Sequence, residues 1–279
     1  MLKRLPSRVL PPRLREQWRA MQTRRRLDAL RRRMMSNPPR TSGVETCFGY
    51  TVRINDAPNF YTMYKDLFVN RLYHFTASRP DPRILDCGSN IGMSILYFKR
   101  CYPQARIVGF EADPIVYPYL EENIARNALS GVELVPAAVS ARAGVMTFYA
   151  DGKYGSALAA QMPGGAPDGW KTVEVPCVRL RDYLDAPADF VKLNIEGAEW
   201  DVLADTADRL RQVRELVIEY HHLPGLPRTL HNLLTLLHEQ GFEYLVNAFD
   251  PQTNPGVQPP FRLTEHTHYF LLIYAKRKD

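Results

Sequence analysis

A short apolar run ends in an aspartate and a glycine-rich turn in the stretch ILDCGSNIGMSI, residues 84–95. The run Ile84–Cys87 predicts a buried strand, and Met93–Cys101 predicts the helix that follows it. A strand, turn and helix of this kind are typical of parallel sheets, in which ligands bind beyond the carboxyl ends of the strands. This one feature therefore predicts an α/β fold with a binding site at the turn.

The rest of the chain repeats the alternation of strands and helices. It predicts a mostly parallel sheet flanked by helices, and the last two strands predict an antiparallel edge near the C-terminus. The other predicted strands are Arg106–Glu111, Val132–Ala137, Val145–Tyr149, Val173–Val178, Phe190–Asn194, Leu216–Tyr220, Tyr244–Ala248 and His268–Ala275. The other predicted helices are Phe60–Phe75, Tyr117–Asn127, Glu199–Leu210 and Leu230–Gln240.

The turn after the first strand has the pattern Asp-x-Gly-x-Asn-x-Gly, formed by Asp86, Gly88, Asn90 and Gly92. It is neither a GxGxxG fingerprint nor a P-loop, because the spacing differs and no lysine follows. The glycines let the backbone turn and approach a ligand, and Asn90 supplies an amide. S-adenosylmethionine, which has no phosphate, suits this loop: the loop amides can take its carboxylate, and Asp86 can attract its amino group, directly or through water.

A second carboxylate supports an adenosine-type ligand. Glu111 ends the next predicted strand, twenty-five residues beyond Asp86. There it can accept hydrogen bonds from both ribose hydroxyls, a device that NAD enzymes share. Small residues follow the third strand at Ala137, Ala138 and Val139; they suit an adenine face, and ordinary sheet packing explains them equally well. The predicted cofactor-binding residues are Asp86, Gly88, Asn90, Gly92, Glu111 and Ala138.

The charge of the chain is concentrated at its start. Residues 1–40 hold one lysine and twelve arginines against Glu16 and Asp28, a net charge of +11 in a chain of +6, so residues 41–279 stand at −5. We therefore predict a basic extension over residues 1–40 and a folded domain over 41–279. The extension is interpreted as a solvated or self-docked arm, or as a contact for an acidic partner, an anionic membrane surface or a nucleic acid.

Composition disfavours several classes of protein. No run approaches the roughly 20 apolar residues that cross a bilayer, and the first thirty residues lack the apolar core of a secretory signal. We therefore expect a cytoplasmic protein. The four cysteines form no CxxC pair and no spacing with histidines that is typical of zinc sites, so buried free thiols are expected.

From Arg83 to Leu223 the chain resembles FkbM-type S-adenosylmethionine-dependent methyltransferases, and we expect the resemblance to extend to the C-terminus. The segments that carry the resemblance are ILDCGSNIGMS, GFEADP with LEENIARN, PAAVSARAGVMTF, VKLNIEGAEWDVL and LVIEYHH. The first segment marks only the broad class I methyltransferase fold, whereas the KxxxEGAE segment is specific to the family. The resemblance implies the Rossmann-like class I fold with a seven-stranded sheet, and usually O-methylation of a secondary metabolite or a sugar. The family commonly has an aspartate at the position of Asn194, so a metal-binding role there is left open.

Methyl transfer to a hydroxyl requires a positioned acceptor oxygen, and a general base within hydrogen-bond reach of it assists the reaction. His221 and His222 stand at a strand end, where adjacent side chains point in opposite directions, so only one is expected to face the cleft. We favour His221, and the alternative reading of these histidines is surface or loop anchoring. Glu196 is the other candidate, as base, as orienter of the acceptor or as a helix cap. Glu219 lies in an apolar strand and needs a partner, for which Lys192 is one candidate.

The predicted site residues follow from these positions. The predicted catalytic residues are His221, Glu196 and Lys192, and the predicted substrate-binding residues are Asn194, Glu219, His222 and Tyr154. Tyr154 lies in the long Gly-, Ala- and Pro-rich loop Asp151–Trp170, which is interpreted as a mobile cover or a flexible crossover. A second wall is expected from residues 247–266. No metal site is predicted, and a divalent metal is left open because Asn194, Glu196 and Glu219 offer oxygen ligands.

The acceptor is predicted to be a hydroxyl on a small secondary metabolite, such as a polyketide or peptide natural product. The alternative acceptor is a sugar or a glycolipid. A nucleic-acid methyltransferase is less favoured, because residues 41–279 are acidic on balance and no NPPY motif follows the fourth strand. A non-enzymatic adenosine-binding module is disfavoured by the intact loop, the ribose carboxylate and the EGAE segment.

Overall fold

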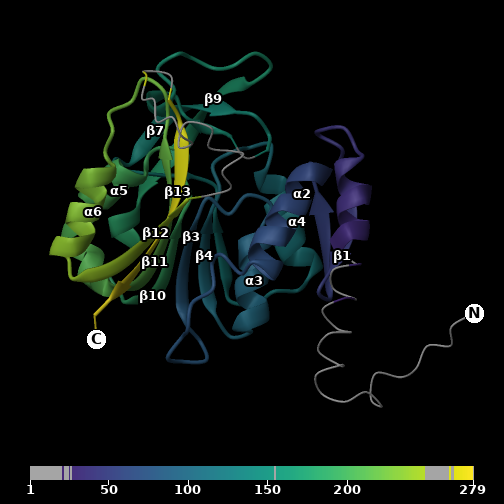
Figure 1. Ribbon diagram of the computed structural model, residues 1–279, viewed down its shortest axis with the longest axis horizontal. Coiled ribbons are helices and arrows are strands. Elements are labelled where there is room, and N and C mark those ends of the chain that lie inside the picture. Colours follow the sequence, from purple (N-terminus) through teal and green to yellow (C-terminus); the bar gives the residue numbers. More distant parts are fainter. Residues whose placement is uncertain are drawn as a thin grey trace, which may run out of the picture.

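The chain folds around a mostly parallel seven-stranded sheet in the residues that the computed structural model describes, which are 21, 25, 27–153, 155–248, 264 and 267–278 (Figure 1). The strand order is β12-β13-β11-β10-β3-β4-β5, parallel from β11 to β5 and antiparallel at β13. This is the predicted class I methyltransferase fold with an antiparallel C-terminal edge. The strands are β3 (Arg83–Cys87), β4 (Arg106–Phe110), β5 (Val132–Val135), β10 (Ala188–Leu193), β11 (Val213–His222), β12 (Phe242–Ala248) and β13 (Tyr269–Arg277).

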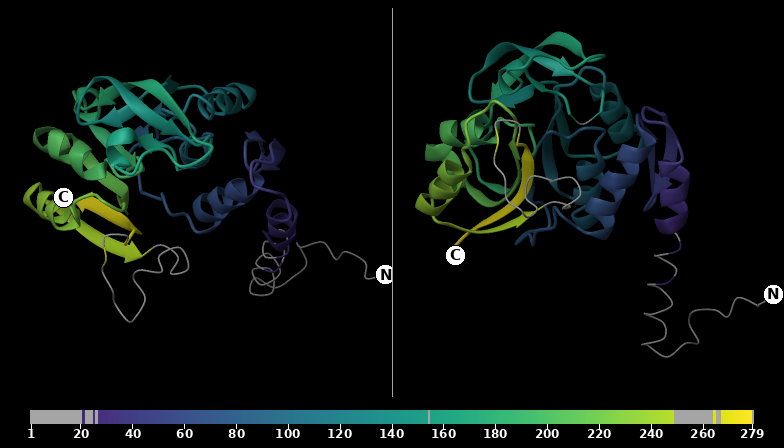
Figure 2. Two further views of the ribbon diagram at one scale, coloured as in Figure 1. Left: turned by 90° about the horizontal axis from the view of Figure 1, so that it is seen from above. Right: turned by 45° about the horizontal axis from the view of Figure 1, so that its top comes forward.

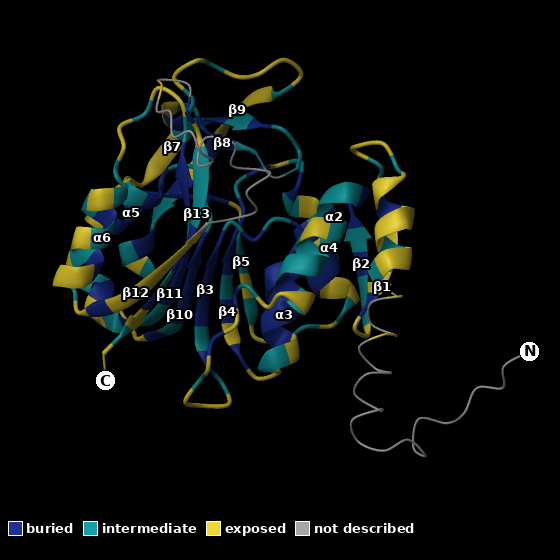
Figure 3. Cartoon of the chain, in the orientation of Figure 1, coloured by how far each residue is buried: buried dark blue, intermediate teal, exposed yellow. Residues whose placement is uncertain are grey.

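Helices cover both faces of the sheet, because successive strand residues point in opposite directions. Within β3, Ile84 packs into the core beneath one set of helices and Leu85 into the core beneath the other. The first set is α2 (Ala57–Tyr64), α3 (Met93–Cys101) and α4 (Tyr117–Arg126), and the second is α5 (Glu199–Asp205) and α6 (Leu230–Glu239). The central strands are accordingly buried on both sides (Figure 3).

A smaller sheet lies across the carboxyl ends of the central strands (Figures 1 and 2). Its order is β6-β9-β7-β8, and its own small core includes Phe148, Val175 and Cys177. The strands predicted at Val145–Tyr149 and Val173–Val178 belong to this sheet and not to the main one. Its strands are β6 (Ala138–Ser140), β7 (Gly144–Ala150), β8 (Ala157–Leu158) and β9 (Lys171–Arg179), and short 3₁₀ helices lie at Ala159–Gln161 (η3) and Leu180–Tyr183 (η4).

Two predicted helices are shorter than their sequence patterns. The segment Phe60–Phe75 forms α2 and then a π-helix, η2 (Lys65–Val69), and Arg71 with φ 58° turns the chain away. The segment Glu199–Leu210 divides into α5 and a 3₁₀ helix, η5 (Ala207–Gln212), at a buried Thr206 whose hydroxyl donates to the Val202 carbonyl. Apolar spacing does not separate these helix types, since all of them place residues three to five apart on one face.

The segment before α2 forms a hairpin that the sequence did not predict, β1 (Gly43–Cys47) with β2 (Tyr50–Ile54). Phe48 and Gly49 both take positive φ in its two-residue turn, as in a type I′ turn. Residues 27–35 are helical, and the side chain of Met34 is only 3% exposed in the same core as α2 and α3. The end of the basic extension therefore packs against the folded domain. In the described residues, no helix has the length and apolar character to span a membrane.

Candidate functional site

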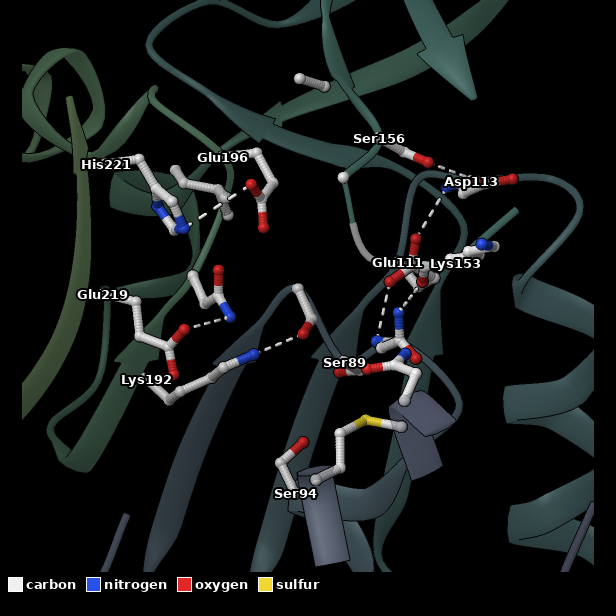
Figure 4. Close-up of a pocket in the computed structure, with 18 of the residues that line it drawn as sticks. Ser89, Ser94, Glu111, Asp113, Lys153, Ser156, Lys192, Glu196, Glu219 and His221 are labelled. Carbon is white, nitrogen blue, oxygen red and sulfur yellow. Dashed lines mark hydrogen bonds and ion pairs between the residues drawn. The ribbon is translucent and has the colours of Figure 1, made fainter. Parts of the chain in front are cut away.

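A cavity of about 1280 Å³ opens at the carboxyl ends of the central strands (Figure 4). Figure 4 shows Glu196, His221 and Glu219 on one side of it and Glu111 and Asp113 on the other. The predicted site residues that line it are Gly88, Asn90, Glu111, Ala138, Lys192, Asn194, Glu196, Glu219 and His221. Among the described residues, Asp86, Gly92 and His222 lie outside its lining. Tyr154, and most of residues 247–266, lie outside the described residues.

The glycine turn fits tightly against the strand next to it. Gly88 has φ +86°, and a Cβ added there would lie 1.9 Å from the carbonyl oxygen of Asn194. The amide groups of Gly88 and Ser89 donate to the Phe110 carbonyl over 3.0 and 2.8 Å, which fixes the turn against β4. Gly92 also has positive φ and faces the Leu120 side chain. Glycine at position 88 is thus required by both backbone angle and space.

Asp86 and Lys192 form a buried ion pair beneath this turn. Asp86 is fully buried, and Lys192 Nζ lies 3.3 Å from its Oδ1 and donates to the Gly88 carbonyl. The hydroxyls of Ser94 and Ser89 donate to Asp86 Oδ2 over 2.5 and 3.0 Å. Lys192 therefore meets Asp86 rather than forming its ion pair with Glu219. Through these contacts Lys192 connects β10 to the glycine turn, which lines the cavity.

Glu111 lies immediately after β4 beside the glycine turn. Its Oε2 accepts the Asn90 amide and its Oε1 accepts the Asp113 amide, each over 2.8 Å. Burial raises the pKa of Glu111 to about 7, although these two hydrogen bonds oppose the rise. An ionised carboxylate has about four lone-pair sites, so each oxygen keeps capacity for one more donor. Those sites suit a pair of hydroxyls.

The loop after β7 is tied to the cavity rim at its beginning. Asp113 Oδ2 accepts the Gly152 amide over 2.9 Å and the Ser156 hydroxyl over 2.6 Å. The Asn90 side chain donates to the Lys153 carbonyl. Anchors at 152, 153 and 156 hold this part of the loop predicted as a cover. Next to it, the cavity has an apolar wall made of Ala137, Ala138, Val139, Phe148, Ala157 and Leu158.

Asn194 and Glu219, the first polar pair, meet on the opposite wall. Asn194 Nδ2 donates to Glu219 Oε2 over 2.8 Å, and the Tyr73 hydroxyl donates to Glu219 Oε1. Burial raises the pKa of Glu219, while the Tyr73 hydrogen bond and the charge of Lys192 act against it. Asn194 Oδ1 has no hydrogen-bond partner within the described part of the chain.

Glu196 and His221, the second polar pair, lie beside the first. His221 Nε2 is 3.6 Å from Glu196 Oε2, and His221 Nδ1 is 2.9 Å from Glu199 Oε1 (Figure 4). Glu199 is fully buried, and its Oε1 also accepts the amides of Ile195 and Gly197 over 3.3 and 3.1 Å. Between those two amides Glu196 takes φ 54°. This backbone conformation costs about 1–3 kcal/mol and persists only where the surrounding contacts hold it. Glu199 therefore fixes both the turn and the imidazole.

The two members of the second polar pair differ in how they titrate near neutral pH. Burial would lower the pKa of His221, but the carboxylates of Glu196 and Glu199 outweigh burial and raise it to about 10. Burial raises the pKa of Glu196 to about 7, and the charge of His221 limits that rise. At pH 7 the imidazole is thus cationic, with Nδ1–H donated to Glu199 and Nε2–H facing Glu196. Glu196 is the group of the pair that exchanges a proton near neutrality.

His222 points to the other face of the sheet, where its ring lies against Tyr269 at 5.0 Å between centroids. Burial lowers its pKa, and the charge of Arg228 lowers it further. The alternation along β11 thus separates the two histidines. In the described residues, no group of three or more His, Cys, Asp or Glu side chains is placed to hold a metal ion.

Sequence reasoning gave no role to two residues that shape the site. Tyr73 lies 146 positions before its partner Glu219, and nothing local in the sequence signals that contact. Glu199 begins a predicted helix, and its bond to His221 depends on the turn at 195–197. The sequence signal for the role of Glu199 is the spacing of the two glutamates in EGAE. It places Glu196 before the helix and Glu199 in the first turn of the helix.

The family described as "Methyltransferase FkbM domain" matches residues 86–244, which include both polar pairs and the glycine turn. Three curated proteins are similar over most of their length. "Methyltransferase sdnD" of Sordaria araneosa is 31% identical, covering 65% of this chain and 81% of that protein. "31-O-demethyl-FK506 methyltransferase FkbM" of Streptomyces tacrolimicus is 29% identical, covering 70% and 86%. "2-O-methyltransferase NoeI" of Sinorhizobium fredii is 28% identical, covering 55% and 69%.

Proposed function

The chain belongs to the FkbM methyltransferase family, and from this we propose that it transfers a methyl group from S-adenosylmethionine to a hydroxyl of a small secondary metabolite. The observation that supports this most is the placement of Glu111 and the glycine turn across one cavity from Glu196. When bound, the donor supplies a methyl group on a sulfonium centre to the acceptor oxygen. The chain's own residues hold the two partners and remove the proton.

The residues around Glu111 fit the donor. Its carboxylate keeps lone pairs for two ribose hydroxyls after accepting the amides of Asn90 and Asp113. The apolar wall at 137–139 gives a surface for an adenine face. Gly88 leaves no room for a side chain because the Asn194 backbone fills that space, which fixes the turn beside the donor site. Asp86 holds Lys192 and acts on the ligand through the position of the turn.

Glu196 is our proposed general base. Its pKa of about 7 leaves a substantial ionised fraction at neutral pH, and cationic His221 stabilises that fraction. The proton of the acceptor hydroxyl passes to a Glu196 carboxylate oxygen as the oxygen–methyl bond forms. His221, favoured from the sequence as the base, already carries its proton at pH 7, so we assign it to holding Glu196 ionised.

Calorimetry with S-adenosylhomocysteine tests the donor site. The Glu111→Ala variant is expected to bind it about 100-fold more weakly or worse, since hydrogen bonds to a charged group contribute about 1.5–3 kcal/mol each. Glu111→Gln keeps the side-chain volume, so its affinity for S-adenosylhomocysteine should lie between those of Glu111→Ala and the wild type. Glu121→Ala removes an exposed carboxylate on α4 and should bind normally. Wild-type affinity in both Glu111 variants would rule out the ribose assignment.

The pH profile tests the base. Below pH 7 the rate of methyl transfer should fall about tenfold per pH unit, because only ionised Glu196 accepts the proton. His221→Gln should move the midpoint above 7, since loss of the imidazolium removes the influence that lowers the pKa of Glu196. His238→Gln, on the exposed face of α6, should leave the midpoint in place. An unchanged midpoint in His221→Gln would show that another group controls the rate.

A second candidate is O-methylation of a sugar or glycolipid. Two polar pairs in one wall of the cavity offer hydrogen bonds to more than one hydroxyl, which favours a polyhydroxylated acceptor. The relative from Sinorhizobium fredii is named a 2-O-methyltransferase. Methylation assays separate the two candidates by comparing turnover of a simple methyl glycoside with turnover of an alicyclic alcohol. Faster turnover of the glycoside would favour the sugar, and faster turnover of the alcohol would favour the secondary metabolite.

A further inference from the structure

We propose that Asn55 and Asp56, which stand just before α2, are positioning residues for donor binding. They fix the Glu111 carboxylate through the β7–β8 connection, residues 151–156, of which 154 lies outside the described residues. The proposal rests on the proposed function. It adds two residues that act on the donor site from a part of the chain that precedes the family match.

Both residues that donate an amide to Glu111 use their side chains to hold the β7–β8 connection. The Asn90 side chain donates to the Lys153 carbonyl. The Asp113 carboxylate accepts a backbone amide and a hydroxyl from the same connection, over 2.9 and 2.6 Å. The position of the connection is therefore coupled to the two amides that fix Glu111.

Asn90 depends strongly on its contact with the connection. It takes φ 50°, a left-handed conformation that is uncommon for residues other than glycine. Such a conformation persists only where the surrounding contacts hold it. The side chain supplies two of them, since Oδ1 accepts the Ile91 amide over 2.9 Å and Nδ2 donates to the Lys153 carbonyl. Loss of the second contact would release the residue whose amide donates to Glu111.

Asn55 and Asp56 hold the connection from its other side. Asn55 Nδ2 donates to the Gly152 carbonyl over 2.9 Å, and Asp56 Oδ2 lies 3.6 Å from Lys153 Nζ. The side chains of Asp56 and Lys153 are 3% and 20% exposed, so this ion pair is largely removed from water. Removal of one partner leaves the other charge uncompensated. We expect Lys153 then to turn toward solvent and to draw its carbonyl away from Asn90.

Asp56 is itself held by two backbone amides. Its Oδ1 accepts the Asn59 amide over 2.8 Å as the N-cap of α2, and its Oδ2 accepts the Arg40 amide over 2.7 Å. The start of α2 and the end of the basic extension thus meet at the carboxylate that pairs with Lys153. Asparagine at position 56 can keep the cap, but its single oxygen cannot serve both amides and it carries no charge for the lysine.

A double-mutant cycle measured by calorimetry with S-adenosylhomocysteine tests the route through Glu111. Asp56→Asn should bind about tenfold more weakly than the wild type, because a displaced Glu111 loses one of its hydrogen bonds to the ribose. In a Glu111→Ala background the same substitution should change the affinity by less than about twofold, since the bonds on which it acts are already absent. A merely structural role would weaken binding equally in both backgrounds.

Further variants separate the contacts. Lys153→Met removes the charge, leaves the α2 cap in place, and should weaken binding at least about threefold with the same dependence on Glu111. It tests the ion pair even where Asp56→Asn fails to fold. Asn55→Leu removes the other contact to the connection and should also weaken binding. Asp81→Asn breaks an ion pair with Arg79 in the segment before β3, at the amino ends of the strands, and should bind normally.

The outcomes separate this inference from the proposed function. Wild-type affinity in both Asp56→Asn and Lys153→Met overturns the positioning role and leaves the methyltransferase proposal in place. Equal losses with and without Glu111 overturn the route through that carboxylate. Failure of S-adenosylhomocysteine to bind the wild type overturns the proposed function and, with it, the inference.

Discussion

Replacement of Glu196 by glutamine is expected to lower kcat by about 10²- to 10⁴-fold, the range that a positioned general base contributes. Glutamine keeps the size of the side chain and one oxygen, but it cannot take the proton of the acceptor hydroxyl. The donor site lies across the cavity, so the affinity for S-adenosylhomocysteine should not change. The measurement is transfer of a labelled methyl group to whichever hydroxyl acceptor the wild type turns over fastest.

Two comparisons make this result specific. Glu121→Gln removes an exposed carboxylate on α4 and should retain wild-type kcat. Glu199→Gln should also lower kcat, but with a shifted pH midpoint, because Glu199 holds His221 and the turn without being placed to receive the acceptor's proton. Turnover by Glu196→Gln within threefold of the wild type would show that the proton leaves by another route.

Much of the site follows from the topology that the sequence predicts. Parallel strands place their carboxyl ends at one edge, so Glu111, Asn194 and Glu219 had to gather there once their strands were recognised. The period of two along β11 also predicted that only one of His221 and His222 would face the cavity. These conclusions need only the direction of each strand.

Contacts between distant residues do not follow in the same way. Which carboxylate Lys192 meets depends on the path of a long side chain, and it pairs with Asp86 on the neighbouring strand. The strands at Val145–Tyr149 and Val173–Val178 were recognised, but periodicity does not say which strand pairs with which. The role of Glu199 depends on a left-handed residue inside a loop, which no propensity predicts for glutamate.

The glycine turn provides the second large effect. Gly88→Ala is expected to lower the free energy of unfolding by about 1–2 kcal/mol for the left-handed conformation and by about 1–3 kcal/mol for overpacking. A Cβ at this position would lie 1.9 Å from the Asn194 carbonyl oxygen, so the turn and β10 must separate. That displacement breaks the Lys192 bond to the Gly88 carbonyl and moves Asn90, whose amide donates to Glu111. Urea titration and calorimetry with S-adenosylhomocysteine measure the two effects.

Gly49→Ala separates backbone conformation from crowding. Gly49 has φ +91°, close to the value at Gly88, but no atom lies within 4 Å of the position its Cβ would take. The free energy of unfolding of Gly49→Ala should therefore fall only by the conformational contribution of about 1–2 kcal/mol, and this variant should bind S-adenosylhomocysteine normally. Gly88→Ala should bind at least about tenfold more weakly, equivalent to about 1.4 kcal/mol of lost contact. Equal losses of stability in the two variants, with donor binding intact in both, would mean that the turn can move away from β10 without disturbing the site.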